Sequence, residues 1–167
     1  MSLLPIFLRL ERRKCLVVGA GIVALAKIES LRGAAAEITV VAPRALVEVR
    51  ELAQEGALVW RERAFQPSDL DGIFLVIAAT NAVDVNHAVY EEARRRNVLC
   101  NAVDDPPNCD FYFGSVVARG DLQVAISTAG ESPALAQRLR REIDAQDRKS
   151  TRLNSSHIQK SRMPSSA

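Results

Sequence analysis

The sequence predicts an α/β fold, in which a Rossmann-like parallel sheet is followed by a β-hairpin and a helix. Over about residues 1–110, short apolar runs alternate with helical patterns. This alternation is typical of parallel strands that are joined by right-handed crossover helices. Beyond residue 110 the alternation stops, and two β-rich runs joined by Arg119, Gly120 and Asp121 indicate a hairpin outside the parallel sheet.

The expected elements of the sheet follow from continuous apolar runs separated by helical patterns. Such runs suit strands that are buried on both faces. They predict strands over Lys14–Val18, Glu37–Ala42, Ala57–Arg61, Ile73–Ala79 and Val98–Ala102. The patterns between them predict helices over Ile22–Leu31, Ala45–Gln54 and Val83–Arg96.

The expected elements after residue 110 are two strands and one helix. The hairpin strands are predicted over Tyr112–Ala118 and Leu122–Ser127. Ser132 suits the N-cap of a helix and Pro133 suits its first position, so a helix is expected to begin at Pro133.

The composition divides the chain into three parts. We expect a Rossmann domain over residues 1–110 and the start of a second region over residues 111–146. From residue 147 the sequence is polar and serine-rich, without periodicity. Its first residues, Asp147 to His157, match one translated frame of a common sequencing adapter. We therefore expect the natural sequence to stop near Gln146 and residues 147–167 to be a non-native disordered tail; a native disordered tail is the alternative.

The overall composition is that of an ordinary globular protein, with 48% apolar and 25% charged residues. The net charge of +2 implies no strong field for nucleic acid or a membrane surface, and no apolar run approaches the ~18 residues of a membrane span. The three cysteines, Cys15, Cys100 and Cys109, show no metal-binding spacing and indicate reduced thiols. We expect a cytoplasmic protein with no nucleic-acid or membrane partner.

A glycine-rich turn follows the first expected strand, with the spacing Gly-x-Gly-x-x-Ala at Gly19, Gly21 and Ala24. In dinucleotide sites the first glycine allows the sharp turn, the second lets a pyrophosphate approach the backbone, and the third small residue lets the helix pack closely. The helix N-terminus then offers unpaired N–H groups to the phosphates. The pattern predicts an NAD site, but a plain strand-to-helix turn has the same spacing.

The residues after the second expected strand, Pro43 and Arg44, include no carboxylate, whereas the usual fingerprint has an acid there that holds the ribose hydroxyls. Three alternatives stay open: backbone groups hold the ribose, Arg44 faces a phosphate, or no dinucleotide binds. The fourth expected strand ends in small residues followed by Thr80, which leaves room for a ligand where the strand order reverses. Close packing against the first helix explains the same small residues.

Polar residues in two later loops are candidates for chemistry. Asp104 follows the fifth expected strand, where open α/β sheets place their active-site loops, and could act as a general base or bind a cation. A turn is the simpler interpretation, since an aspartate before Pro-Pro favours one. The segment Ser127–Ser132 precedes the last helix, where its N–H groups and hydroxyls could receive an anion or only cap the helix.

These motifs together resemble the N-terminal module of the siroheme synthases, the precorrin-2 dehydrogenase and sirohydrochlorin ferrochelatase family. The likeness runs from LLPIF through CLVVGAGIVA and AATNAVDVNHAV to CNAVDD, and it closes with AISTAGESPALAQRLR. It covers about residues 3–146, and the last motif is far more specific than the glycine turn.

The resemblance implies that precorrin-2 is oxidised to sirohydrochlorin with hydride transfer to NAD⁺. It also implies possible insertion of Fe²⁺ to give siroheme, and a homodimer in the full-length protein, whose dimerisation and substrate region would begin with the hairpin and helix. It assigns the catalytic role to Asp104. The residues expected to bind the cofactor, with Thr80 added from its place at a strand end, are Gly19, Gly21, Ile22, Val23, Pro43, Arg44 and Thr80. The residues expected to bind substrate are Ser127, Thr128, Gly130 and Ser132.

Two other functions fit parts of the same sequence. A non-catalytic nucleotide-binding Rossmann module would share the glycine turn, but it has no need for Asp104 or for Ser127–Pro133. An inactive fragment of the enzyme would share every motif. The sequence indicates no cluster of Cys and His ligands, so it leaves any metal preference unknown.

Overall fold

The structure is a computed structural model that describes residues 3–145. The described residues divide into two compact units, one formed by Pro5–Tyr112 and the other containing residues 113–145. The predicted non-native tail, residues 147–167, lies outside the described residues.

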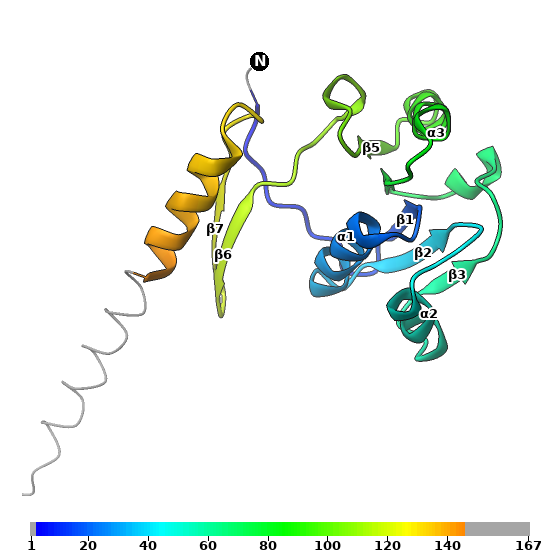
Figure 1. Ribbon diagram of the computed structural model, residues 1–167, viewed down its shortest axis with the longest axis horizontal. Helices are drawn as coiled ribbons and strands as arrows, with labels where there is room; N and C mark the ends of the chain where they lie inside the picture. The colour runs from blue at the N-terminus through cyan, green and yellow to red at the C-terminus, as the bar shows by residue number, and fades with distance from the viewer. Residues whose placement is uncertain (1–2, 146–167) are drawn as a thin grey trace, which may run out of the picture. The chain divides into compact units, whose positions relative to one another are not determined.

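The larger unit contains a five-stranded parallel sheet with the order β3-β2-β1-β4-β5 (Figure 1). Its strands are β1 (Lys14–Val18), β2 (Glu37–Val41), β3 (Val59–Arg61), β4 (Leu75–Ala78) and β5 (Leu99–Ala102). Its helices are α1 (Ile22–Gly33), α2 (Val47–Gln54) and α3 (Val83–Arg95), with the short 3-10 turns η1 (Pro67–Leu70) and η2 (Pro106–Asn108). The predicted Rossmann-like sheet is confirmed, with element ends that differ by one or two residues.

The sheet is buried on both faces, and β1 shows why its sequence is a continuous apolar run. Cys15 and Val17 belong to one core layer, together with Ile28 of α1. Leu16 and Val18 point to the opposite layer, which contains Val89 of α3. Full burial of one Leu, Ile or Val side chain contributes about 1.5–3 kcal/mol, so the two layers together stabilise the sheet from both sides.

The connection from β3 to β4 contains no α-helix, unlike the other crossovers. It consists of an extended segment and the single turn η1, in which Leu70 is 1% exposed and packs into the α3 layer. This short connection brings Arg61 of β3 close to Asp69 of η1.

The second unit contains the antiparallel hairpin of β6 (Ser115–Arg119) and β7 (Leu122–Ile126), followed by helical residues 133–145 (Figure 1). The predicted hairpin and the predicted helix start at Pro133 are therefore confirmed, although the first strand begins at Ser115 and not at Tyr112. Arg119 forms an ion pair with Asp144, which ties the hairpin to the helix. Leu135 on this helix is 42% exposed.

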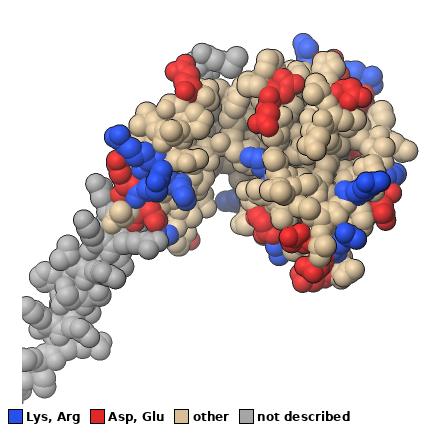
Figure 2. Space-filling model, viewed as in Figure 1, with Lys and Arg blue, Asp and Glu red and all other residues tan. Residues whose placement is uncertain are grey.

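Charged side chains of both signs lie on the surface of the described residues (Figure 2). On the face of the described residues that Figure 2 shows, basic and acidic side chains are interspersed rather than gathered into one patch of a single sign. Within residues 3–145, no helix has both the length and the apolar character needed to cross a bilayer.

Candidate active site

A pocket of about 580 Å³ lies at the carboxyl ends of β1, β2 and β4. In a doubly wound sheet this edge is where ligands bind, beside the strand at which the order reverses. Five of the predicted cofactor-binding residues line the pocket: Gly19, Gly21, Pro43, Arg44 and Thr80. Residues far apart in the sequence thus share one cavity large enough for part of a dinucleotide.

The two glycines of the turn are required for different reasons. Gly19 has φ +108°, and a Cβ built there would lie 2.3 Å from Ala79 O, so only glycine fits between β1 and β4. Gly21 precedes α1 as its N-cap, and a Cβ there would meet no atom within 4 Å. Glycine is therefore required at position 19 by close packing against Ala79, whereas Gly21 leaves open space in front of the N-terminus of α1.

The side chains of Ile22 and Val23 do not line the pocket. They lie in the first turn of α1 and are 79% and 48% exposed. Any contact of these two residues with phosphates therefore has to use their backbone N–H groups, which point out of the helix N-terminus. Their assignment to the cofactor site stays a prediction.

Thr80 is held in place by Asn86, a residue of α3 that is 6% exposed. The Thr80 hydroxyl donates to Asn86 Oδ1 at 2.7 Å, and the Thr80 N–H donates to the same oxygen at 3.2 Å. In return Asn86 Nδ2 donates to Thr80 O at 3.0 Å. One buried amide thus fixes the backbone and the side chain of a pocket residue.

The role of Asn86 was missed, although the sequence carries a signal for it. Asn86, Val89 and Ala93 have the spacing of one helix face, and all three are buried. A polar residue on an otherwise apolar helix face needs a partner, because an unpaired buried amide costs free energy. Here the partner is the end of β4.

Replacement of Asn86 by alanine is expected to lower the free energy of unfolding by about 1–3 kcal/mol, because polar groups of Thr80 lose their partner. The loosened strand end is also expected to weaken NAD⁺ binding several-fold. Urea unfolding and titration calorimetry with NAD⁺ measure the two effects. His87→Ala, an exposed change next to it on α3, is the matched control; equal affinity for NAD⁺ in both variants would contradict the positioning role.

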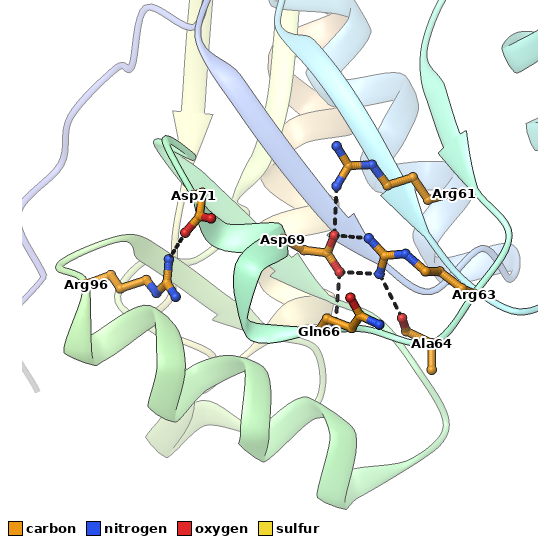
Figure 3. Close-up of polar contacts among 7 residues, drawn as sticks. All are labelled: Arg61, Arg63, Ala64, Gln66, Asp69, Asp71 and Arg96. Carbon is orange, nitrogen blue, oxygen red and sulfur yellow. Dashed lines mark hydrogen bonds and ion pairs between the residues drawn. The ribbon is translucent and has the colours of Figure 1, made fainter.

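The outer wall of the pocket includes Ala64 and Phe65, in the segment between β3 and η1. Arg63 holds this segment, since its Nη1 donates to Ala64 O at 3.0 Å and to Asp69 Oδ2 at 2.7 Å. Its Nη2 also donates to Asp69 Oδ1, at 2.5 Å. The Asp69 carboxylate thereby links the wall of the pocket to η1 (Figure 3).

The Asp69 carboxylate accepts two further hydrogen bonds, from Arg61 at 2.8 Å and from the Gln66 N–H at 2.9 Å (Figure 3). Its side chain is completely buried. Burial raises the pKa of Asp69, but the hydrogen bonds from Arg63, Gln66 and Arg61 outweigh it and leave the pKa below its usual value. The carboxylate therefore stays ionised and paired.

Asp104 lies on the loop after β5, outside the pocket-lining set, with φ +60° and an exposed side chain. Aspartate adopts this left-handed backbone more readily than most residues other than glycine. Lys27 of α1 lies within its electrostatic reach: burial lowers the pKa of Lys27, and the charge of Asp104 opposes this shift. Asp104 thus lies near α1, the helix whose N-terminus opens onto the pocket.

The thiols of Cys15 and Cys100 are neutral groups of the core. Burial raises the pKa of Cys15 to about 11, and burial together with the nearby Asp110 and Cys109 raises that of Cys100 to about 12. All three cysteines are free. Within residues 3–145, no three His, Cys, Asp or Glu side chains are grouped to hold a metal ion.

The predicted substrate loop lies in the second unit, before helical residues 133–145. Ser127 Oγ accepts the Ala129 N–H at 3.2 Å, and Thr128 Oγ1 accepts the Ser132 N–H at 3.2 Å. Ala129 and Gly130 are both left-handed, with φ 52° and 85°. The hydroxyls of Ser127 and Thr128 therefore stabilise a tight turn. A role in substrate binding stays a prediction for Ser127, Thr128, Gly130 and Ser132.

Two family models match the chain. Residues 6–115 match the family described as "Putative NAD(P)-binding", and residues 119–146 match "Sirohaem biosynthesis protein central". The siroheme synthase 1 of Cronobacter sakazakii is 49% identical over 145 residues, and the siroheme synthase of Photorhabdus laumondii is 46% identical. Each of these alignments covers 87% of this chain and 31% of the relative, so the chain spans about a third of the length of these relatives.

A solved structure also resembles the chain. It is described as SirC, precorrin-2 dehydrogenase, and it superimposes with a TM-score of 0.77 and 27% sequence identity over 98% of this chain and 83% of that protein. The likeness to the siroheme synthase module that the sequence motifs predicted is thus confirmed, and the chain belongs to the NAD(P)-binding family that its residues 6–115 match.

Proposed function

We propose that the protein is an NAD-dependent dehydrogenase that oxidises precorrin-2 to sirohydrochlorin in siroheme biosynthesis. The observation that carries the proposal is the likeness to a precorrin-2 dehydrogenase over 98% of the chain, which includes both the pocket and the substrate loop. The siroheme synthase relatives, at 45–49% identity, support the same pathway.

The pocket residues support a role in holding the dinucleotide. The open space at Gly21 and the free N–H groups at the start of α1 suit a pyrophosphate. Phe65 and the small residues around Ala79 offer an apolar wall for a flat base. NAD⁺, when bound, accepts the hydride that leaves a carbon of precorrin-2.

Asp104 is proposed as the base of the reaction. Loss of a hydride from precorrin-2 must be matched by loss of a proton, so that a new double bond forms and sirohydrochlorin results. The Asp104 carboxylate, which lies near α1, can take that proton. Its exposed position leaves it accessible to a large tetrapyrrole.

The substrate loop is proposed to receive carboxylates of the tetrapyrrole. Backbone N–H groups at the start of helical residues 133–145 favour anions. A homodimer is proposed as well: two strands alone form a marginal sheet, and Val116 and Leu122 of the hairpin are 47% and 57% exposed. Insertion of Fe²⁺, as a second substrate, stays a prediction of the family resemblance.

The test is an anaerobic assay with precorrin-2 and NAD⁺, followed by the absorbance of NADH and sirohydrochlorin. The Asp104→Asn variant is expected to lose about 100-fold or more in rate, the usual contribution of a general base. Asparagine tolerates the left-handed backbone as aspartate does, so the fold should be kept. The affinity for NAD⁺ is expected to stay unchanged, because Asp104 does not line the pocket.

Asp121→Ala, which removes an exposed carboxylate from the hairpin turn, is the matched control and should keep the full rate. A full rate in Asp104→Asn would disprove the catalytic role of Asp104. Binding of NAD⁺ without any turnover of precorrin-2 would instead favour a non-catalytic nucleotide-binding module.

A further inference from the structure

The strand that leads to Asp104 carries a buried amide on an otherwise apolar run. Asn101 of β5 is 7% exposed. Leu99 and Val103, two positions before and after it, pack against the core layer that contains Ile28 of α1, so Asn101 faces the same layer. A buried amide costs free energy unless its polar atoms find partners. The partners of Asn101 therefore show what this residue holds in place.

The Asn101 side chain joins β5 to the far end of the loop that follows it. Its Nδ2 donates to Phe111 O at 2.7 Å and contacts Cys109 Sγ at 3.4 Å. The Cys109 thiol in turn donates to Ala102 O at 3.1 Å. Asn101 and Cys109 also pair as an isolated antiparallel bridge. The chain therefore returns alongside β5, and the amide of Asn101 holds it there.

The loop that this contact closes carries Asp104. The Val103 N–H donates to Ala78 O at 2.9 Å, so the pairing with β4 continues one residue past the end of β5. Asp104 comes next, with its left-handed φ of +60°. On the return, the Asp110 N–H donates to Cys100 O at 2.8 Å. Asp104 thus lies on a short loop that is fixed to the sheet at both of its ends.

The same amide fixes the loop against α1. Phe111, whose carbonyl it binds, and Val103 at the other end of the loop both pack against the core layer of α1. Lys27 of this helix lies within the electrostatic reach of Asp104. Loss of the amide would remove the hydrogen bond to Phe111 O and allow the returning segment to move relative to α1, and Asp104 would move with it.

We propose that Asn101 is a positioning residue for Asp104, because its buried amide closes the loop that carries this carboxylate. The inference rests on the proposed dehydrogenase function, in which Asp104 takes a proton from precorrin-2, and deepens it. Asn101 does not line the dinucleotide pocket. Its loss is therefore expected to slow proton removal and to leave the binding of NAD⁺ unchanged.

A double-mutant cycle in the anaerobic assay tests this role. Asn101→Ala is expected to lower the kcat of precorrin-2 oxidation about tenfold or more, with the affinity for NAD⁺ kept. In the Asp104→Asn background the same change should have little further effect, because the carboxylate that it positions is already absent. Equal losses in both backgrounds would overturn the positioning role, since a merely structural residue would act without Asp104.

Two further variants separate the hydrogen bond from the volume of the side chain and from the loop in general. Asn101→Asp keeps the volume but lacks the N–H donor, and it should show the same loss of kcat. Asn108→Ala is the matched control: it removes another amide of the loop, which donates to the Asp105 carboxylate at 2.7 Å and not to β5. It should keep kcat within about twofold. A loss as large as that of Asn101→Ala would overturn the role assigned to the attachment at β5.

The closed loop can also be tested without turnover, through its thiol. Burial raises the pKa of Cys109, and the thiol is bonded to Ala102 O, so it should react slowly with dithionitrobenzoate in the folded wild type. In Asn101→Ala the reaction at Cys109, identified by peptide mapping, should be about tenfold faster or more, while the buried Cys15 stays protected. Reaction of wild-type Cys109 at the rate of an exposed thiol would overturn the closed loop.

The outcomes distinguish this inference from the function on which it rests. A full rate in Asn101→Ala, together with an active wild type and an impaired Asp104→Asn, would overturn the positioning role alone. No turnover of precorrin-2 by the wild type, or a full rate in Asp104→Asn, would overturn the proposed chemistry of Asp104 and the role of Asn101 with it.

Discussion

Replacement of Gly19 by alanine is expected to lower the free energy of unfolding by about 3 kcal/mol or more and to abolish dinucleotide binding. The new methyl group would overlap the carbonyl of Ala79, 2.3 Å from the ideal Cβ position, and φ +108° lies where side chains are rarely accepted. Either β1 and β4 separate at their carboxyl ends or the turn changes shape. Urea unfolding and NAD⁺ calorimetry measure the two losses.

Gly21→Ala is the matched control for this experiment. Its Cβ meets nothing within 4 Å and its backbone is extended, so the free energy of unfolding should fall by no more than about 1 kcal/mol. Dinucleotide affinity should still fall, because the methyl group occupies the space kept for the pyrophosphate. Equal stabilities of the two alanine variants would show that Gly19 is not constrained as described.

Replacement of Asp69 by alanine is expected to lower the free energy of unfolding by about 2–4 kcal/mol. The change removes a fully buried carboxylate and leaves the guanidinium groups of Arg61 and Arg63 without their shared partner. Because both guanidinium groups are partly exposed, water recovers some of the loss, and the effect stays below that of a fully buried pair. Chemical denaturation measures it.

Asp71→Ala provides the control two residues away. Its carboxylate also pairs with an arginine, Arg96, but it is 69% exposed (Figure 3). Pairs of this kind contribute about 1 kcal/mol or less. Equal losses of unfolding free energy in Asp69→Ala and Asp71→Ala would show that burial of the Asp69 carboxylate does not account for its contribution to stability.

The contribution of Asp69 also depends on pH in a defined direction. Because its pKa is lowered in the folded state, its stabilisation is complete above the unfolded-state pKa of about 4. It is lost as the pH falls through the lower folded-state value. The difference in unfolding free energy between the wild type and Asp69→Asn should therefore be constant near neutral pH and shrink below about pH 4.

Local patterns were sufficient for the elements of this fold but not for the contacts between them. The run Lys14–Val18 suited a strand with two buried faces, Pro133 suited the start of a helix, and the structure has both. The Asp69 pairing was not predictable, since it depends on the short β3–β4 connection bringing Arg61 and Arg63 onto η1. No periodicity in the sequence encodes that crossover.

The glycine turn and the ends of the strands allowed part of the candidate site to be predicted from the sequence. Different roles were expected for Gly19 and Gly21, and the structure shows close packing against Ala79 at the first and open space at the second. Asn86 acts across two elements, and its partner Thr80 lies at a strand end that the helix pattern alone does not identify. The left-handed backbone of Asp104, with φ +60°, was likewise not predicted from the sequence.

Trp60 lies where its fluorescence can serve as a probe of the pocket. It is the only tryptophan in the chain. Its indole Nε1 donates a hydrogen bond to the carbonyl oxygen of Ala42, a residue that lines the pocket. Reduced nicotinamide absorbs light at the wavelengths at which tryptophan emits. A reduced dinucleotide bound in this pocket is therefore expected to quench the fluorescence of Trp60, which would report occupancy of the proposed site without any label.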